Sequence, residues 1–380
     1  MNRAGARPAG HIAIILHDFP AGGTERIAIR LAGAWAAAGR RVTIFCGAAE
    51  GPLRAMVPAS VAVVEMQPPI RRGPGSRLRF GRKVAAVIDA AEPDILFVPG
   101  NFHLMVLRAM RGRLRHRPPT VMKISNPLSD PDRLLPRAVS RGAVGLVAAD
   151  VDVFVAMSPA LAAEARKELP SARIAVIAEP NLDGRDPLPS RPEGADLMVA
   201  AGRFVPQKDF GLLVRAVATL AADAPRVVLL GEGPERPRIE RLIRRLRLDD
   251  RVECAGLVAD IRPWLDRARL FLLPSRYEGF PAVVVEALAR GVPVVATDCS
   301  PALHELITGP DFGEIVRGRS PEAFAAAVAR QLARPRPAPE KLMAQVAGNR
   351  LDASAAAYLR LFDTLSAAAM PMVAAERVAA

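Results

Sequence analysis

A repeated alternation of short apolar runs with amphipathic stretches narrows the possible folds more than any other feature. Residues 11–19, HIAIILHDF, suit a mostly buried strand, and a Gly-Gly turn follows. The stretch TERIAIRLAGAWAAAG has the period of an amphipathic helix, with Thr24 as N-cap and Gly39 at its end. Further apolar runs are RRVTIFC, VAVVEM, DILFVPG, TVMKIS, VDVFVAMS and ARIAVIAE. Strands that alternate with helices form parallel sheets, so we expect an α/β domain over residues 1–184.

A second series of the same kind follows a break in the pattern. The stretch DGRDPLPSRPEGA has three prolines, two glycines and no apolar period, which predicts a linker at 185–195. Beyond it, LMVAAGRF, RVVLLGEG, RVECAGL, LFLLPS and VPVVATD indicate the strands of a second domain over 196–349. We expect two doubly wound parallel sheets that face a central cleft, the usual ligand position in such folds. A helix over 350–365 is predicted to pack back on the first domain, and 366–380 to form a tail.

The overall composition indicates an ordinary globular protein of 380 residues, with 51% apolar and 24% charged residues. Three distant cysteines without a CxxC pair indicate neither a disulfide framework nor a zinc site. No apolar run approaches the roughly 20 residues needed to span a bilayer, and the N-terminus has no signal-peptide core. These features predict a cytoplasmic protein.

Two glutamates eight residues apart are the first candidates for a site. In RYEGFPAVVVEALARG, Glu278 lies in a loop after a predicted strand, and Pro281 is placed at the first position of a helix that contains Glu286. A buried carboxylate without a partner costs several kcal/mol, so Glu286 needs a ligand or a cation. The hydroxyls of a ribose or sugar would satisfy both carboxylates. An internal ion pair with an arginine is the alternative.

A second loop adds two cations at the same predicted sheet edge. Arg203 and Lys208 follow the first strand of the second domain, where a guanidinium and an ammonium suit a diphosphate. An exposed basic loop without a ligand is the alternative. In the first domain, Gly22 and Gly23 let a ligand approach the backbone at a helix start. The sequence LLGEGPER lacks the third glycine of a nicotinamide-binding fingerprint, which excludes that cofactor.

The ordered set GGTERIAIRLAG, GRFVPQKDF, LLGEGPER and RYEGFPAVVVEALARGVPVVATD resembles the retaining glycosyltransferases of family 4, which have the two-domain GT-B fold. The resemblance covers about residues 11–365 and includes the E-x7-E pair formed by Glu278 and Glu286. It implies transfer of a sugar from a nucleotide-diphosphate sugar to a hydroxyl acceptor, a saccharide or a lipid-linked saccharide, in polysaccharide or lipopolysaccharide synthesis. It implies no metal and no cofactor beyond this co-substrate.

The resemblance also assigns roles to single residues. Arg203 and Lys208 would hold the diphosphate and stabilise the charge that develops as it leaves. Glu286 would bind the ribose hydroxyls. Glu278 would hold the donor sugar, together with the helix start formed by Gly279, Phe280, Pro281 and Ala282, in which Pro281 has no N–H to donate. Family members lack a convincing protein nucleophile, so a dissociative front-face reaction is expected.

The first domain would complete the site. Gly22 and Gly23 would approach the diphosphate, and His103, in VPGNFHLM, matches a family histidine that touches the donor sugar. A surface or structural histidine is the alternative for His103. The sequence departs from many relatives at Pro301 and Ala302, where they have a glycine-rich turn, and at TVMKISNPLSD, which lacks their histidine.

The strongly basic first half raises the question of partners. Residues 1–190 hold 26 Lys and Arg against 16 Asp and Glu, whereas the remainder holds 26 against 23, within a total net charge of +13. The stretches 71–83 and 108–117 contain eleven Lys and Arg and no acid. These basic stretches could attract the protein to the anionic inner face of a membrane. The alternative is a solvated surface without a partner.

Three rival functions remain to be compared. A nucleic-acid-binding protein would use the basic stretches, but they contain one aromatic residue, Phe80, and no binding motif, so no nucleic-acid partner is expected. A nonhydrolysing nucleotide-sugar epimerase has the same fold and would need no acceptor. A metal-dependent transferase would use the DxD of Asp150 and Asp152, which we interpret as charges at the start of a strand.

Overall fold

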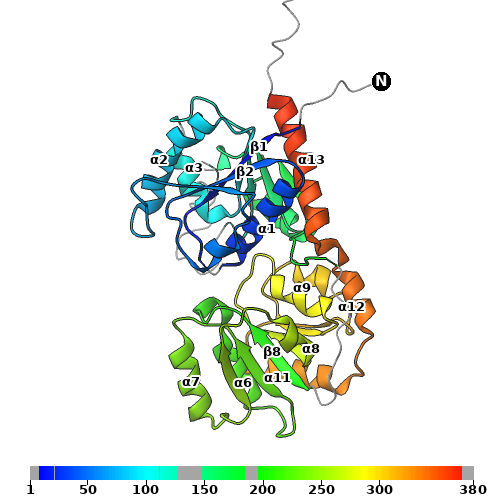
Figure 1. Ribbon diagram of the computed structural model, residues 1–380. Helices are drawn as coiled ribbons and strands as arrows, with labels where there is room; N and C mark the ends of the chain where they lie inside the picture. Colours follow the sequence, from blue (N-terminus) through cyan, green and yellow to red (C-terminus); the bar gives the residue numbers. More distant parts are fainter. Residues whose placement is uncertain are drawn as a thin grey trace, which may run out of the picture. The chain divides into compact units, whose positions relative to one another are not determined.

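The computed structural model describes residues 8–20, 22–110, 112–126, 128, 145, 148–184 and 196–369. These residues form two compact units, shown in Figure 1. The first unit contains the chain up to Pro180 together with the chain from Arg350, and the second runs from Asn181 to Asn349. The linker predicted at 185–195 and most of the predicted tail lie outside the described residues.

The first unit is built on a seven-stranded sheet in which every neighbouring pair is parallel. The strand order is β3-β2-β1-β4-β5-β6-β7. The strands are β1 (His11–Leu16), β2 (Arg41–Cys46), β3 (Ala62–Glu65), β4 (Ile95–Val98), β5 (Thr120–Lys123), β6 (Val153–Ala156) and β7 (Ile174–Val176). Because all strands are parallel, the loops after β1 and β4 meet at one sheet edge, which brings His17 and His103 to the same side.

Helices cover both faces of this sheet. Alternate residues of β1 belong to opposite cores: Ile12, Ile14 and Leu16 pack in one cluster, and Ala13 and Ile15 in the other. This is the two-sided burial that parallel strands require. The helical segments are α1 (Gly23–Ala37), η1 (Pro52–Met56), α2 (Ser76–Ala91), η2 (Asn101–His103), α3 (Leu104–Met110), α5 (Pro159–Glu168) and α13 (Leu351–Ala369).

The long helix α13 returns the chain to the first unit and packs beside α1 (Figure 1). Trp35 of α1 makes edge-on contacts with Tyr358 and Phe362 of α13, at ring-centroid distances of 5.7 and 5.1 Å. Phe97 of β4 completes this aromatic cluster, 5.2 Å from the ring of Trp35. Buried aromatic pairs of this kind contribute roughly 0.5–1.5 kcal/mol each beyond their buried area. The helix also extends to residue 369, beyond the predicted end at 365.

The second unit repeats the architecture with a six-stranded parallel sheet of order β10-β9-β8-β11-β12-β13. Its strands are β8 (Leu197–Ala201), β9 (Arg226–Leu230), β10 (Val252–Gly256), β11 (Ala268–Leu273), β12 (Val294–Thr297) and β13 (Gly313–Val316). Its helical segments are η3 (Pro206–Lys208), α6 (Phe210–Val217), α7 (Arg236–Arg245), α8 (Arg262–Asp266), α9 (Ala282–Ala289), α10 (Leu303–Leu306), α11 (Pro321–Ala333), α12 (Pro339–Gln345) and η4 (Ala347–Asn349). The predicted pair of doubly wound parallel sheets is confirmed.

Two predicted helix starts are wrong by one or two residues. α1 begins at Gly23 with Gly22 as N-cap, so Thr24 lies inside the helix. The cap is made by the backbone, since the carbonyl of Gly22 accepts from the N–H of Arg26. α9 begins at Ala282, and Pro281 is its N-cap, because the backbone of Pro281 is still outside the helical region at ψ 76°.

Candidate functional site

Lys208 and Glu278 form the centre of the candidate site in the second unit. Lys208 ends η3 after β8, and Glu278 lies in the loop after β11, which is the neighbour of β8 in the sheet. The Nζ of Lys208 lies 2.5 Å from Oε1 of Glu278, and the hydroxyl of Ser275 donates to the same oxygen at 2.6 Å. Glu278 is buried, so two donors replace the water that its carboxylate has lost. Sequence reasoning proposed both residues but gave no signal for this contact or for Ser275.

The helix start beyond Glu278 offers fewer donors than expected. The N–H of Ala282 donates to the carbonyl of Phe280 at 2.9 Å, so the prediction of a free Ala282 N–H is wrong. A tight turn centred on Pro281, with φ −80° and ψ 76°, brings these two groups together. The hydroxyl of Ser300 donates to the carbonyl of Gly279 at 2.6 Å and holds the loop in place. The N–H groups of Gly279 and Phe280 have no hydrogen-bond partner among the described residues.

Glu286 and Arg203 lie near this centre in sequence but are more exposed. Glu286 sits just over one turn into α9 and is half-buried rather than buried. Arg203 lies in the loop between β8 and η3, and its side chain is exposed. Its guanidinium donates no hydrogen bond to any residue that the structure describes.

Glycines let the loops of the site approach one another closely. Gly231 follows β9 at φ +134°, and a Cβ there would lie 2.0 Å from the carbonyl oxygen of Gly202, which follows β8. Gly233, at φ +156°, would place a Cβ 2.5 Å from the carbonyl of Phe204. Only glycine fits either position. The GxG of LLGEG therefore has a structural role beneath the loop that carries Lys208.

The first unit holds the other predicted residues. Gly22 and Gly23 form the N-terminus of α1, and no atom lies within 4 Å of a Cβ built on Gly23. Next to them, Glu25 is buried, and this burial raises its pKa, although Arg72 lies 3.3 Å away. The open space at Gly23 is compatible with a ligand that approaches the backbone.

His103 is a buried histidine, not a surface one. It is 1% exposed, its ring lies 4.2 Å from that of Phe102, and both ring nitrogens lack a hydrogen-bond partner among the residues that the structure describes. Burial, with the charges of His17 and Arg72, lowers its pKa to about 3, so the imidazole is neutral at pH 7. It lines a cavity of about 410 Å³ together with His17, whose Nε2 lies 3.0 Å from Oγ of Ser76. A neutral imidazole there can exchange a hydrogen bond with a hydroxyl group but cannot supply a positive charge.

Comparison with known proteins identifies the family. The family model described as "Glycosyltransferase Family 4" matches residues 21–180, and the model "Glycosyl transferases group 1" matches residues 195–334. The first match falls on the first unit and the second match on the second unit. The chain belongs to the family 4 glycosyltransferases.

Curated relatives match this glycosyltransferase over about a third of its length. The lipopolysaccharide core biosynthesis glycosyltransferase LpsE of Rhizobium meliloti is 39% identical over 108 residues, which cover 28% of this chain and 31% of the relative. The N-acetylgalactosamine-N,N'-diacetylbacillosaminyl-diphospho-undecaprenol 4-alpha-N-acetylgalactosaminyltransferase of Campylobacter jejuni is 33% identical over 119 residues, or 31% of this chain and 32% of the relative. The matched stretches thus span less than half of these relatives.

Solved structures match the whole architecture of the family 4 chain. The sucrose-phosphate synthase of Thermosynechococcus elongatus has a TM-score of 0.79 at 21% identity and covers 94% of this chain and 99% of its own. WaaG, a glycosyltransferase involved in lipopolysaccharide biosynthesis, has a TM-score of 0.67 at 17% identity, with coverage of 93% and 98%. At such identities the likeness establishes the GT-B fold alone.

One buried ion pair of the glycosyltransferase was missed by sequence reasoning. Nζ of Lys123, at the end of β5, lies 2.6 Å from Oε1 of Glu179, and both side chains are buried. A lysine in the apolar run TVMKIS is a weak signal for it, because a buried lysine needs a carboxylate partner. The pair ties the carboxyl end of β5 to the segment that follows β7.

The DxD residues lie at the amino end of β6. The carboxylate of Asp152 accepts from the N–H of Thr120 at 2.8 Å, and Asp150 lies 4.0 Å from Arg117. This agrees with a role as strand-edge charges. Within the described ranges, no three His, Cys, Asp or Glu side chains gather as a metal site. The helices of the same ranges include none that is long and apolar enough to cross a bilayer.

Proposed function

We propose that this protein is a retaining glycosyltransferase that moves a sugar from a nucleotide-diphosphate sugar to a hydroxyl of a saccharide or lipid-linked acceptor, in the synthesis of a cell-surface polysaccharide or lipopolysaccharide. The observation that carries the proposal is the contact between Lys208 and Glu278, two residues of the family pattern 70 positions apart. The names of the matched relatives support the synthetic context. A neighbour of the same fold solved in complex with UDP-glucose supports the donor class.

The loop after β8 would bind the diphosphate. Lys208 is held by Glu278 at the carboxyl edge of the sheet, and Arg203 extends from the same loop into solvent. Two cations at this edge would neutralise the negative charge that grows on the diphosphate as the glycosidic bond breaks. The free N–H groups of Gly279 and Phe280 would add donors for oxygen atoms of the donor.

The two glutamates would bind rather than act as nucleophiles. Oε1 of Glu278 is already occupied by Lys208 and Ser275, so Glu278 orients the lysine and leaves its second oxygen for a sugar hydroxyl. Glu286, half-buried on α9, would accept from the ribose hydroxyls. With neither carboxylate assigned to attack the anomeric carbon, the leaving diphosphate would deprotonate the acceptor on the same face, which retains the configuration.

A nucleotide screen tests the donor site. The purified protein is heated with UDP, GDP and ADP and with their sugar conjugates, with and without a divalent cation. A ligand that binds only the native state raises the melting temperature. We expect one diphosphate family to raise it without metal, and Glu286→Ala to lose the effect. An unchanged shift in Glu286→Ala would remove the ribose assignment.

Dependence on an acceptor separates transfer from epimerisation. A transferase consumes its donor at an appreciable rate only when a saccharide or lipid-linked acceptor is present, whereas an epimerase converts the donor alone. Donor turnover is therefore measured by nuclear magnetic resonance with and without a mixture of lipid-linked saccharides. Formation of an epimeric nucleotide sugar without acceptor would contradict the transferase assignment.

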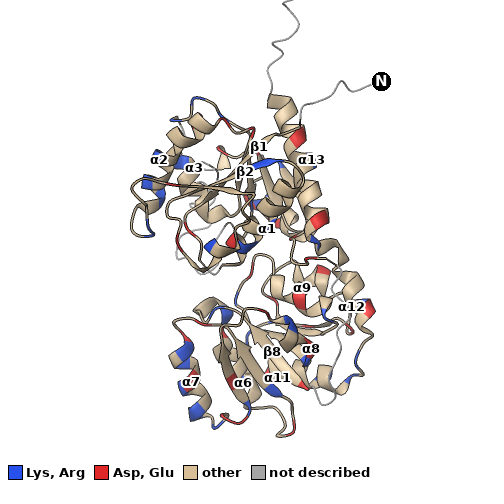
Figure 2. Ribbon diagram, in the orientation of Figure 1, with Lys and Arg blue, Asp and Glu red and all other residues tan. Residues whose placement is uncertain are grey.

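The basic stretches suit a location at the inner face of the membrane. The stretch 71–83 ends on α2, and the stretch 108–117 begins at the end of α3. These two helices pack against each other, and Figure 2 shows Lys and Arg along α2. Arg77, Arg79, Arg82 and Lys83 are exposed, although Arg72 is paired with Asp18. Each well-placed cation adds about 1 kcal/mol of attraction to an anionic leaflet. Sedimentation with anionic vesicles at physiological salt tests this location, and a protein that stays in the supernatant would contradict it.

A further inference from the structure

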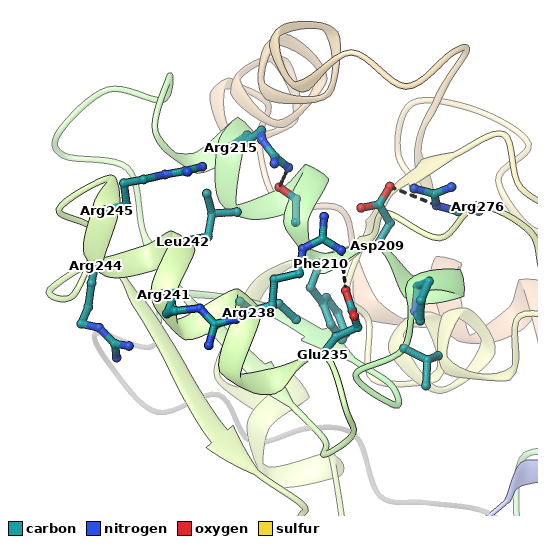
Figure 3. Close-up of a pocket in the computed structure, with 14 residues that line it drawn as sticks. Asp209, Phe210, Arg215, Glu235, Arg238, Arg241, Leu242, Arg244, Arg245 and Arg276 are labelled. Carbon is teal, nitrogen blue, oxygen red and sulfur yellow. Dashed lines mark hydrogen bonds and ion pairs between the residues drawn. The ribbon is translucent and has the colours of Figure 1, made fainter.

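The second unit contains a groove between α6 and α7 that the proposed donor site does not use. Its volume is about 650 Å³, within the range of small-molecule sites. One end is formed by Val205, Pro206 and Asp209, next to the loop that carries Lys208. Six arginines line its walls: Arg215, Arg238, Arg241, Arg244, Arg245 and Arg276 (Figure 3). We call this cavity the arginine groove.

The arginines come from separate elements and converge only in the folded unit. Arg215 lies on α6, Arg276 in the loop after β11, and the others on α7. Figure 3 shows Arg245 extending from α7 toward α6, whereas Arg244 points away. Ile239 and Leu242 are buried on the inner side of α7, which orients the arginines of this helix toward the surface. The backbone of Arg276 donates to the carbonyl of Gln207 at 2.7 Å and fixes that end of the groove.

The two acids of the groove do not neutralise it. Asp209 pairs with Arg276 at 3.6 Å and also with Arg319. Glu235 pairs with Arg238 at 2.8 Å. Arg215 donates to the carbonyl of Gly211, and Arg241, Arg244 and Arg245 have no acidic partner in the described part of the chain. An excess of guanidinium charge is therefore held in a concave surface, where it focuses the field on whatever enters.

The density of this charge indicates the class of ligand. Arg241 and Arg245 are four positions apart on one helix, so their charges repel each other until an anion lies between them. A guanidinium binds phosphate in two-pronged geometry, and one phosphate carries more charge in less space than a carboxylate. A flat membrane would not enter a concave groove as easily as a single headgroup or a small polyanion.

We propose that the arginine groove binds a ligand with two or more phosphate groups, at a site separate from the donor site. The ligand is either a free phosphorylated compound or the headgroup of a phosphorylated lipid. The proposal does not rest on glycosyl transfer, since neither Lys208 nor Glu278 lines the groove between α6 and α7.

Calorimetric titration with tripolyphosphate tests the groove. Two double variants are compared with wild type. The groove variant combines Arg241→Gln with Arg245→Gln, and the donor-loop variant combines Arg203→Ala with Lys208→Ala. The matched control is Arg166→Gln with Arg173→Gln, two exposed arginines of the first unit that change the net charge equally. We expect the Arg241 and Arg245 variant to bind at least about tenfold more weakly, because charge-assisted hydrogen bonds are lost. The donor-loop variant should lose only the tripolyphosphate bound at the donor loop and keep the binding in the groove, and the control should keep the wild-type affinity.

Other results would overturn the proposal. Equal affinity in wild type and in the Arg241 and Arg245 variant would mean that the groove holds no phosphate. Loss confined to the Arg203 and Lys208 variant would place tripolyphosphate in the donor site alone. Both arginines of the groove variant are exposed and have no acidic partner among the described residues, so circular dichroism should show an intact fold.

Vesicles distinguish the two sources of phosphate. Wild type and the groove variant are sedimented at physiological salt with vesicles that contain cardiolipin, a lipid with two phosphate groups. Loss of sedimentation in the groove variant would assign the groove to a lipid headgroup. Sedimentation that survives in this variant, together with weakened tripolyphosphate binding, would assign it to a free phosphorylated compound.

Discussion

Nζ of Lys208 lies 2.5 Å from Oε1 of Glu278, and the hydroxyl of Ser275 donates to that same oxygen. The three residues come from η3 and from the loop after β11, and parallel strands bring them to one edge of the second sheet. The lysine is thereby oriented before any ligand binds. A catalytic cation that is already in position stabilises developing charge without reorganisation.

Replacing Lys208 should lower turnover more than donor affinity. We expect Lys208→Met to reduce kcat by roughly 10²–10³-fold, the usual effect of losing one group that stabilises developing charge. It should also destabilise the second unit by about 1–3 kcal/mol, because Glu278 stays buried with Ser275 as its remaining donor. Steady-state kinetics and urea unfolding measure the two effects, with Trp264 as the probe of the second unit. A normal kcat would contradict the role of Lys208 at the diphosphate.

Gly23→Ala separates ligand approach from folding. No atom lies within 4 Å of the new Cβ, and alanine is favoured over glycine in a helix by up to about 1 kcal/mol, so stability should be unchanged or higher. If a donor contacts this backbone, its KM should rise while the fold is kept. Gly231→Ala is the contrasting variant: its Cβ would lie 2.0 Å from the carbonyl oxygen of Gly202, so the second unit should lose stability. An unchanged KM in Gly23→Ala would remove the glycine from the site.

The buried pair of Lys123 and Glu179 should be costly to break from one side. Lys123→Met removes the cation beside the buried carboxylate of Glu179 and should cost about 3–5 kcal/mol. The double variant with Glu179→Leu should recover much of this loss, because two apolar side chains need no partner. Urea unfolding of a Trp264→Phe background, in which Trp35 reports on the first unit, measures both variants. Equal losses in the single and double variants would show that the pair is not coupled.

His103 should make the first unit less stable as the pH falls. Its pKa is about 3 in the folded state against the ordinary histidine value of 6.5 in the unfolded chain, so the unfolded chain binds the extra proton between these pH values. The contribution of the neutral His103 to the free energy of unfolding is therefore fully present above pH 6.5 and declines below it. The loss between pH 7 and pH 5 amounts to up to about 2 kcal/mol. The lowered pKa of His17 acts in the same direction.

Unfolding at the two pH values tests this effect. The difference in unfolding free energy between pH 7 and pH 5 should shrink in His103→Gln. His116→Gln, which replaces an exposed histidine, serves as the control and should behave as wild type. A difference that is the same in all three proteins would mean that the ring of His103 is protonated as easily in the folded chain as in the unfolded one.

The sheets were accessible from sequence because each strand carries its own signal. Runs such as HIAIIL and RVVLL are apolar at every position, which is typical of strands buried on both faces, and helical periods separate them. β13 was missed, since the four residues GEIV contain a glycine and a glutamate and pair only with β12 at the sheet edge. The predicted first residues of α1 and α9 differ from the observed ones. The helices begin where the backbone angles after Gly22 and Pro281 become helical, and side-chain preferences alone do not show this point.

The contacts that give the site its chemistry depend on distances that no local pattern carries. The motif residues Lys208, Glu278 and Glu286 stand out in the sequence, yet the pairing of Lys208 with Glu278 follows from the adjacency of β8 and β11 in the sheet. The same holds for His103, whose lowered pKa depends on burial by segments distant in sequence. It also holds for the arginine groove, because α6 and α7 bring together side chains from separate stretches. Propensity and periodicity act over a few neighbouring residues, whereas desolvation and charge act between whichever groups the packed sheets bring together.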